Sequence, residues 1–124
     1  IRDRGSADPI FRGIPEQFKG IRWHGAHVVS LSSHGECLAL SNDGAIQAFR
    51  HSDGIYGLQF HAEMSSEKLN QWLAQEDYVN ALVRLRGNRA VHAFRRDASH
   101  HMSQINYHAS LIFRNFVELA SRKT

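Results

Sequence analysis

The chain changes from strand to helix at Gly57-Leu58-Gln59-Phe60-His61-Ala62-Glu63. An apolar strand is predicted over residues 55–60, and the polar turn after it carries an imidazole and a carboxylate two residues apart. Side chains at i and i+2 of an extended backbone lie on the same face. His61 and Glu63 are therefore expected to point the same way, so that the carboxylate can fix the tautomer of the imidazole. A purely structural histidine at the end of an apolar strand is the simpler alternative.

The segments before this turn are predicted to be short strands. Residues 18–31 are expected to be extended around Val28-Val29, with a bend at Trp23-His24-Gly25. Two apolar runs follow, residues 37–40 and 45–49, joined by the strong hairpin signal Ser41-Asn42-Asp43-Gly44. A second turn, residues 51–54, leads into the strand at 55–60. This spacing predicts an antiparallel meander.

After Glu63 the apolar spacing becomes helical. Ser65 and Ser66 are candidate N-caps, and a helix is predicted from there to a stop at Gly87. Residues 87–99 are expected to be a polar connector, and a second helix is predicted over residues 99–120. Strands followed by two helices indicate an α/β or α+β fold. A doubly wound sheet would begin with βαβ units, which are absent upstream of the meander.

Composition narrows the function classes. The 124 residues fit one domain, and the formal net charge is +3. Basic residues follow a helix end rather than alternating with exposed aromatics, so a nucleic-acid partner is not expected. The sequence has neither an apolar run of membrane-spanning length nor a signal peptide, so no membrane partner is expected either. A single cysteine, Cys37, excludes a disulfide within the chain and favours a reducing, cytoplasmic compartment.

A metal site is the rival use of the histidines. His61 and Glu63 could supply two ligands, but a site needs three or four with supporting hydrogen bonds. The other candidates, His24, His27 and His34, have irregular spacing. No metal is therefore expected.

Residues 57–63 resemble the Gly-x-Gln-Phe-His-Pro-Glu signature of class I glutamine amidotransferases. The segment from Asp8 to Pro15 and the turn Trp23-His24-Gly25 resemble the family in the same order. Residues 38–43 and 46–49 resemble its next two strands. The similarity covers residues 8 to about 73 and is greatest to stand-alone relatives of the GMP synthase glutaminase domain. It implies a flavodoxin-like α/β domain, of which residues 1–124 would be the C-terminal portion.

The resemblance implies hydrolysis of the glutamine side-chain amide by a Cys-His-Glu triad without a cofactor. His61 corresponds to the general acid/base and Glu63 to the carboxylate that orients it. Trp23, His24 and Gly25 correspond to the turn that lines the glutamine pocket. Ala62 replaces the motif's proline without removing a functional group. Ala26 stands where many relatives have aspartate.

The nucleophile departs from the family pattern. The family's cysteine sits in a Gly-x-Cys-x-Gly elbow upstream of the Trp-His-Gly turn, whereas Cys37 lies downstream of it in a short apolar run. Such a cysteine is expected to be a small buried hydrophobe. The chain therefore carries two of the three triad members. We expect it to be a partial domain whose N-terminal half, with the elbow, is missing; a split subunit and a degenerate relative are the two alternatives.

Two other functions stay open at this point. A catalytically silent amidotransferase-like binding domain would lack the elbow cysteine altogether. A γ-glutamyl peptide hydrolase on the same fold would cleave other γ-glutamyl bonds. The expected partners are glutamine, the missing half and a synthetase or acceptor domain. Self-association is also expected, since unpaired strand edges and apolar surface would be left open.

Overall fold

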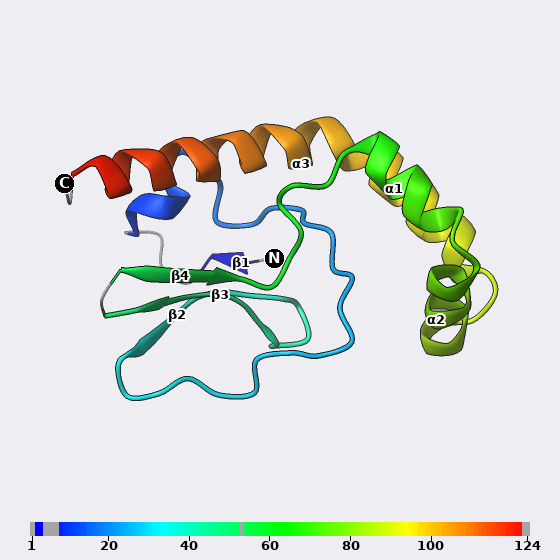
Figure 1. Cartoon of the computed structure of the whole chain (residues 1–124), viewed down its shortest axis with the longest axis horizontal. Coiled ribbons are helices and arrows are strands. Elements are labelled where there is room, and N and C mark those ends of the chain that lie inside the picture. The colour runs from blue at the N-terminus through cyan, green and yellow to red at the C-terminus, as the bar shows by residue number, and fades with distance from the viewer. Residues whose placement is uncertain (1, 4–7, 53, 123–124) are drawn as a thin grey trace.

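The fold is a small antiparallel sheet covered by helices, seen in a computed structural model that describes residues 2–3, 8–52 and 54–122 (Figure 1). A long helix lies across the sheet, and two shorter helices gather at one end of it. The elements in order are β1 (Arg2–Asp3), the 3-10 helix η1 (Pro9–Phe11), β2 (Gly35–Leu40), β3 (Ile46–His51), β4 (Ile55–Leu58), α1 (Ser66–Leu73), α2 (Glu76–Arg86) and α3 (Ala90–Ser121).

The predicted meander is present. The sheet order is β1-β2-β3-β4, and every neighbouring pair is antiparallel. The hairpin turn at residues 41–44 closes with Gly44 N donating to Ser41 O (2.9 Å), and Gly44 has a φ of 83°. That left-handed conformation is the reason for a glycine at this turn position. The second turn closes from Gly54 N to His51 O (2.9 Å), with residue 53 outside the described residues.

The strand predicted over residues 18–31 is wrong. The described chain there is irregular, and its strand-like pairing is a single bridge between Ile21 and His61. The segment crosses from the helices to the far side of the sheet before β2 begins (Figure 1). A strand needs a partner edge along its whole length, and this path meets one at a single position.

The first predicted helix is two helices, which corrects the prediction of two helices in all. The break falls at Ala74 and Gln75, where Gln75 takes an extended conformation (φ −84°, ψ 120°). The two carboxylates that follow, Glu76 and Asp77, lie in the first turn of α2, where negative charge is favourable. Gly87 ends α2 as predicted, with a φ of 82°.

The polar connector predicted over residues 87–99 is also wrong, because α3 already begins at Ala90. Val91 and Phe94 pack against buried residues and extend the apolar stripe of α3 toward its N-terminus. The arginines at 95 and 96 lie on the exposed face of the same turns. The apolar stripe of α3 then continues through residues 99–120, the range over which the sequence predicts a helix. None of the helices in the described residues has the combined length and apolarity needed to cross a membrane.

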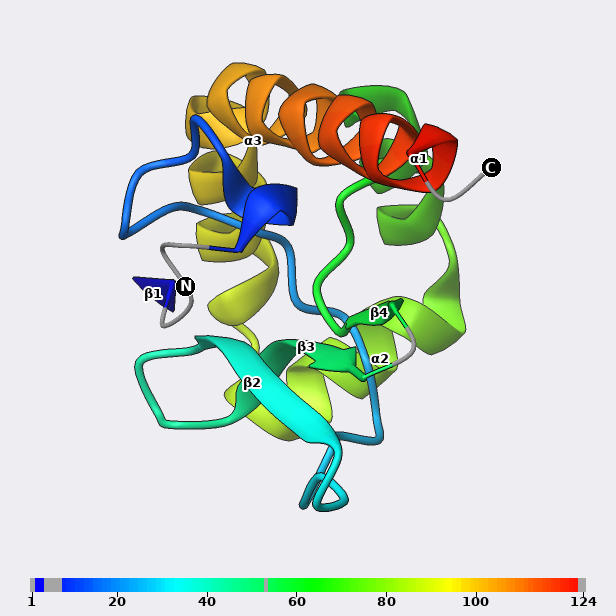
Figure 2. The same cartoon turned by 90° about the vertical axis from the view of Figure 1, so that its left-hand side faces the viewer.

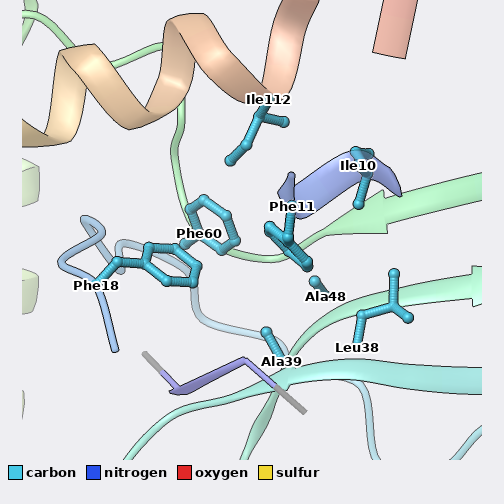
Figure 3. Packing of buried hydrophobic residues seen from close by; sticks show 8 residues of the cluster. All are labelled: Ile10, Phe11, Phe18, Leu38, Ala39, Ala48, Phe60 and Ile112. Carbon is cyan, nitrogen blue, oxygen red and sulfur yellow. The ribbon is translucent and has the colours of Figure 1, made fainter. Parts of the chain in front are cut away.

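Two apolar clusters meet near residue 61. The first lies between the sheet and α3, with η1 wedged beneath that helix (Figures 2 and 3). It consists of Ile10, Phe11, Phe18, Leu38, Ala39, Ala48, Phe60 and Ile112. The second joins α1 to α3 and consists of Ile21, Met64, Leu69, Leu73, Ala98, Met102 and Ile105. Phe60 is anchored in the first cluster and Met64 in the second, so residues 61–63 are fixed at both ends.

Candidate functional site

The backbone of His61 is held at the end of the β4 strand path. β4 ends at Leu58, but Gln59 N still donates to Gln47 O on β3 (2.8 Å). His61 N donates to Ile21 O (2.8 Å) across the isolated bridge. Gln59 also accepts a hydrogen bond from Val28 N through Oε1 (3.2 Å), which ties the irregular segment to the strand end.

The side chains of His61 and Glu63 are in contact, as their spacing predicts. His61 Nδ1 lies 2.7 Å from Glu63 Oε1. The His61 side chain is 26% exposed and that of Glu63 is 59% exposed, so the pair sits at the surface within reach of a substrate. The arrangement is that of a carboxylate orienting an imidazole.

The electrostatics of Glu63 favour the charged carboxylate. Burial acts to raise the pKa of Glu63, but hydrogen bonds from His61 and from the Glu63 backbone amide oppose it. The charges of His61 and Lys68 act in the same direction as these hydrogen bonds, so the pKa lies below its ordinary value of 4.5. At neutral pH Glu63 is therefore an acceptor for a proton on His61 Nδ1.

The other ring nitrogen of His61 also faces an acceptor. Nε2 lies 3.0 Å from the backbone carbonyl oxygen of Trp23. A neutral imidazole donates from one nitrogen only, whereas the protonated ring donates from both. The geometry therefore suits an imidazolium that donates to Glu63 on one side and to the Trp23 carbonyl on the other. This contact joins the Trp23-His24-Gly25 turn to the histidine.

The turn itself lines a hollow beside α2. Trp23, His24 and Gly25 border a cavity of about 260 Å³ together with Leu82 and Arg86, among others. His24 Nδ1 lies 2.5 Å from Ala26 O, while its buried Nε2 has no hydrogen-bond partner among the described residues. The turn thus borders the cavity with the exposed backbone of Gly25, while the Trp23 carbonyl is its point of contact with His61.

Cys37 lies away from the pair formed by His61 and Glu63. It lies opposite Phe49 on β3, and Phe49 lies opposite Gly57 on β4. Two strand spacings put the Cys37 backbone about 10 Å from Gly57, and His61 lies four residues further along the chain. Its partly buried Sγ is 3.7 Å from Ala39 O within its own strand.

The close packing of β3 on β4 explains the first residue of the motif. A Cβ on Gly57 would come within 2.3 Å of the Phe49 ring, so any larger residue at this position would require that ring to shift.

The histidines do not gather into a metal site. In residues 2–3, 8–52 and 54–122, no group of three or more His, Cys, Asp or Glu side chains could hold an ion. His61 and Glu63 therefore face each other without a third ligand from the described chain.

Sequence reasoning missed two contacts of His61. One is the Trp23 carbonyl, and the other is the ring of Trp72 on α1, whose centroid lies 5.1 Å from that of the imidazole. A backbone carbonyl leaves no mark on the residue type. Trp72 falls on the apolar stripe of a predicted helix, and nothing local in the sequence relates it to His61.

Comparison with known proteins gives one family and one fold. A family model described as glutamine amidotransferase class-I matches residues 1–81. A GMP synthase (glutamine-hydrolyzing) of Thermosipho africanus is 29% identical over 82 residues, which are 65% of this chain and 16% of that protein. Anthranilate synthase component 2 of Methanothermobacter marburgensis is 39% identical over 57 residues, 44% of this chain and 29% of that protein.

A solved structure shares the fold. The crystal structure of a glutamine amidotransferase from Thermotoga maritima matches with a TM-score of 0.72 at 21% identity, over 93% of this chain and 47% of that one. The chain therefore spans under half of that structure and under a third of either curated relative.

Proposed function

Because this chain belongs to the class I glutamine amidotransferase family, we propose that it supplies the histidine and carboxylate of a glutamine-hydrolysing Cys-His-Glu triad. The observation that carries the proposal is the 2.7 Å contact between His61 Nδ1 and Glu63 Oε1 at the strand end. It is the contact that holds the tautomer of a general base.

In the proposed reaction a cysteine thiol gives its proton to His61 Nε2, and the sulfur attacks the side-chain amide carbon of glutamine. The C–N bond breaks, and His61 returns the proton to the leaving nitrogen, which departs as ammonia. Water then adds to the γ-glutamyl thioester with His61 as base, the C–S bond breaks, and glutamate and the free thiol are released. Glu63 keeps its charge and stabilises the imidazolium at both stages.

The thiol of this proposal comes from outside the 124 residues. Cys37 is the only cysteine of the sequence, and its strand register separates it from His61. Nε2 now faces the Trp23 carbonyl, so an incoming thiol would replace that oxygen as the partner of Nε2. The thiol would arrive on a separate segment or chain of the amidotransferase domain.

The proposed docking place of that segment is an apolar groove. A hollow of about 560 Å³ lies between α3 and β4, and Glu63 is one of its lining residues. Leu58, Phe113 and Phe116 line it and are 37%, 69% and 46% exposed. In the described sheet, β4 pairs only with β3, so its other edge is open to a further strand.

Glutamine is proposed to bind at the Trp23-His24-Gly25 turn. The turn borders a cavity and shares its Trp23 carbonyl with His61, so a substrate held there would lie beside the acid/base group. A cytoplasmic location is part of the same proposal, since a catalytic thiol needs a reducing compartment.

A silent binding domain is the second candidate, favoured by the separation of the one cysteine from His61. Ammonia release from glutamine distinguishes the two when the chain is assayed with the polypeptide that carries the Gly-x-Cys-x-Gly elbow. The triad predicts turnover that falls by roughly 10²–10⁴-fold in His61→Ala.

Unchanged turnover in that variant contradicts the role of His61. An absence of turnover when the elbow-bearing polypeptide is present favours the silent domain. Activity toward other γ-glutamyl bonds in place of glutamine would favour a γ-glutamyl hydrolase.

A further inference from the structure

The imidazole of His61 has an aromatic neighbour that the proposed chemistry does not use. The ring of Trp72 stands perpendicular to it, with centroids 5.1 Å apart and an interplanar angle of 89°. This is the edge-to-face arrangement that aromatic pairs prefer. Trp72 lies in the last turn of α1, and its side chain is partly buried.

Helix α1 is held firmly relative to His61. Ser65 caps the helix, with its hydroxyl accepting from Lys68 N (3.1 Å), so α1 starts three residues after Glu63. Leu69 and Leu73 are 2% and 6% exposed and bury the inner face of the helix. Trp72 is therefore carried on an element that has little freedom to shift.

Other rings hold the indole of Trp72 in place. Trp23 lies 5.7 Å from it and Tyr78 lies 5.8 Å from it, measured between ring centroids. Trp23 in turn packs on Phe94 of α3 at 5.3 Å. The cluster draws one ring from the irregular segment and one from each helix, and the carbonyl of its member Trp23 is the acceptor at His61 Nε2.

We propose that Trp72 is a positioning residue that holds the His61 imidazole in the plane where Nδ1 meets Glu63. The hydrogen bond alone is a weak restraint, because Glu63 is 59% exposed and water competes for both partners. Packing against the Trp72 indole restricts rotation of the His61 ring, which the hydrogen bond to Glu63 alone would allow. The proposal rests on the acid/base function proposed for His61, and it makes α1 part of the site.

The test follows the Nδ1 proton of His61 by NMR in this chain, without any assay of activity. Wild-type protein is expected to give nuclear Overhauser effects between the two rings and a slowly exchanging Nδ1 proton. In Trp72→Leu the exchange of that proton with water is expected to accelerate by up to about tenfold, the factor one aromatic pair can supply. Trp72→Phe is expected to restore most of the protection.

Leu82→Ala is the matched control. Leu82 packs against the same apolar cluster from α2, so its loss loosens the core at a different residue. An unchanged exchange rate in folded Trp72→Leu, or equal acceleration in Leu82→Ala, would overturn the proposal. The absence of ring-to-ring effects in wild-type protein would overturn it even if Trp72→Leu failed to fold. None of these readouts depends on turnover, so a failure of the triad proposal would be recognised separately.

Discussion

His61 is held from three sides by groups of different kinds. The Glu63 carboxylate meets one ring nitrogen, the Trp23 carbonyl meets the other, and the Trp72 ring packs against the imidazole. Only the first of these partners is close in sequence. A general base needs one nitrogen fixed and the other able to exchange partners, and the weaker, backbone contact at Nε2 is the one a catalytic thiol would replace.

A second histidine, His108, is expected to make the free energy of unfolding depend on pH. It is 5% exposed, packs against the Phe18 ring at 6.1 Å, and its buried Nδ1 has no hydrogen-bond partner within the described chain. Burial lowers the pKa of His108 from its ordinary value of 6.5. The unfolded chain therefore takes up this proton at a higher pH than the folded chain does.

The stability contribution of neutral His108 is complete above pH 6.5 and is lost as the pH falls through the lowered folded pKa. Below pH 6.5 the free energy of unfolding is expected to fall by up to about 1.4 kcal/mol per pH unit from this group. Urea titrations between neutral and mildly acidic pH measure the slope. His108→Leu should flatten it, and exposed His92→Leu on the same helix should leave it unchanged. Equal slopes in wild type and His108→Leu would refute the assignment.

The 3-10 helix η1 is joined to α3 through the buried amide of Asn115. Asn115 is 1% exposed, and its Nδ2 donates to Ile10 O (3.0 Å) and to Arg12 O (2.9 Å). Asp8 caps η1 by accepting from Ile10 N (3.0 Å). The side chain of Asn115 therefore satisfies two carbonyls at the end of a 3-10 helix that lies beneath α3.

Removing that amide is expected to be costly. Asn115→Ala leaves both carbonyls without their donor and should lower the free energy of unfolding by about 2–3 kcal/mol. Asn106→Ala, on an exposed turn of the same helix, should change it by less than about 0.5 kcal/mol. Chemical denaturation of the three proteins gives the comparison, and similar losses in the two variants would show that the amide has no special role.

Which elements can be predicted from sequence depends on how local their causes are. The hairpin at 41–44 is predicted correctly because turn residues act locally. The break at residues 74–75 is missed because an apolar stripe passes through it, and the early start of α3 is missed because its exposed face carries arginines. The strand predicted over 18–31 fails because pairing depends on a partner edge, which sequence patterns do not reveal.

The same distinction applies to the site. The contact between His61 and Glu63 follows from a two-residue spacing, which any extended backbone preserves. The contacts with the Trp23 carbonyl and the Trp72 ring join segments far apart in the chain, and they depend on how α1 and the irregular segment pack. Gly57 illustrates both cases: its place in the motif is visible in the sequence, whereas its close contact with the Phe49 ring on the neighbouring strand is not.

Considering the described residues together, β4 pairs with β3 on one edge only, and its residues Tyr56 and Leu58 line the groove beside α3. In the absence of an elbow-bearing partner, the chain is expected to self-associate through this edge and groove. Phe116→Ser, which removes an aromatic ring from the groove, should shift sedimentation toward monomer. Tyr107→Ser is the control, since Tyr107 is 61% exposed but lies outside the groove lining. A wild-type chain that stays monomeric at high concentration would contradict the expectation.

In the proposed triad, His61 and Glu63 serve a thiol that Cys37 does not supply. A chloroketone analogue of glutamine alkylates a catalytic thiolate, and mass spectrometry of the labelled peptides identifies the cysteine. With the elbow-bearing polypeptide present, we expect rapid labelling of its cysteine, slowed strongly by His61→Ala, and little labelling of Cys37. Rapid, His61-dependent labelling of Cys37 in the isolated chain would contradict the claim.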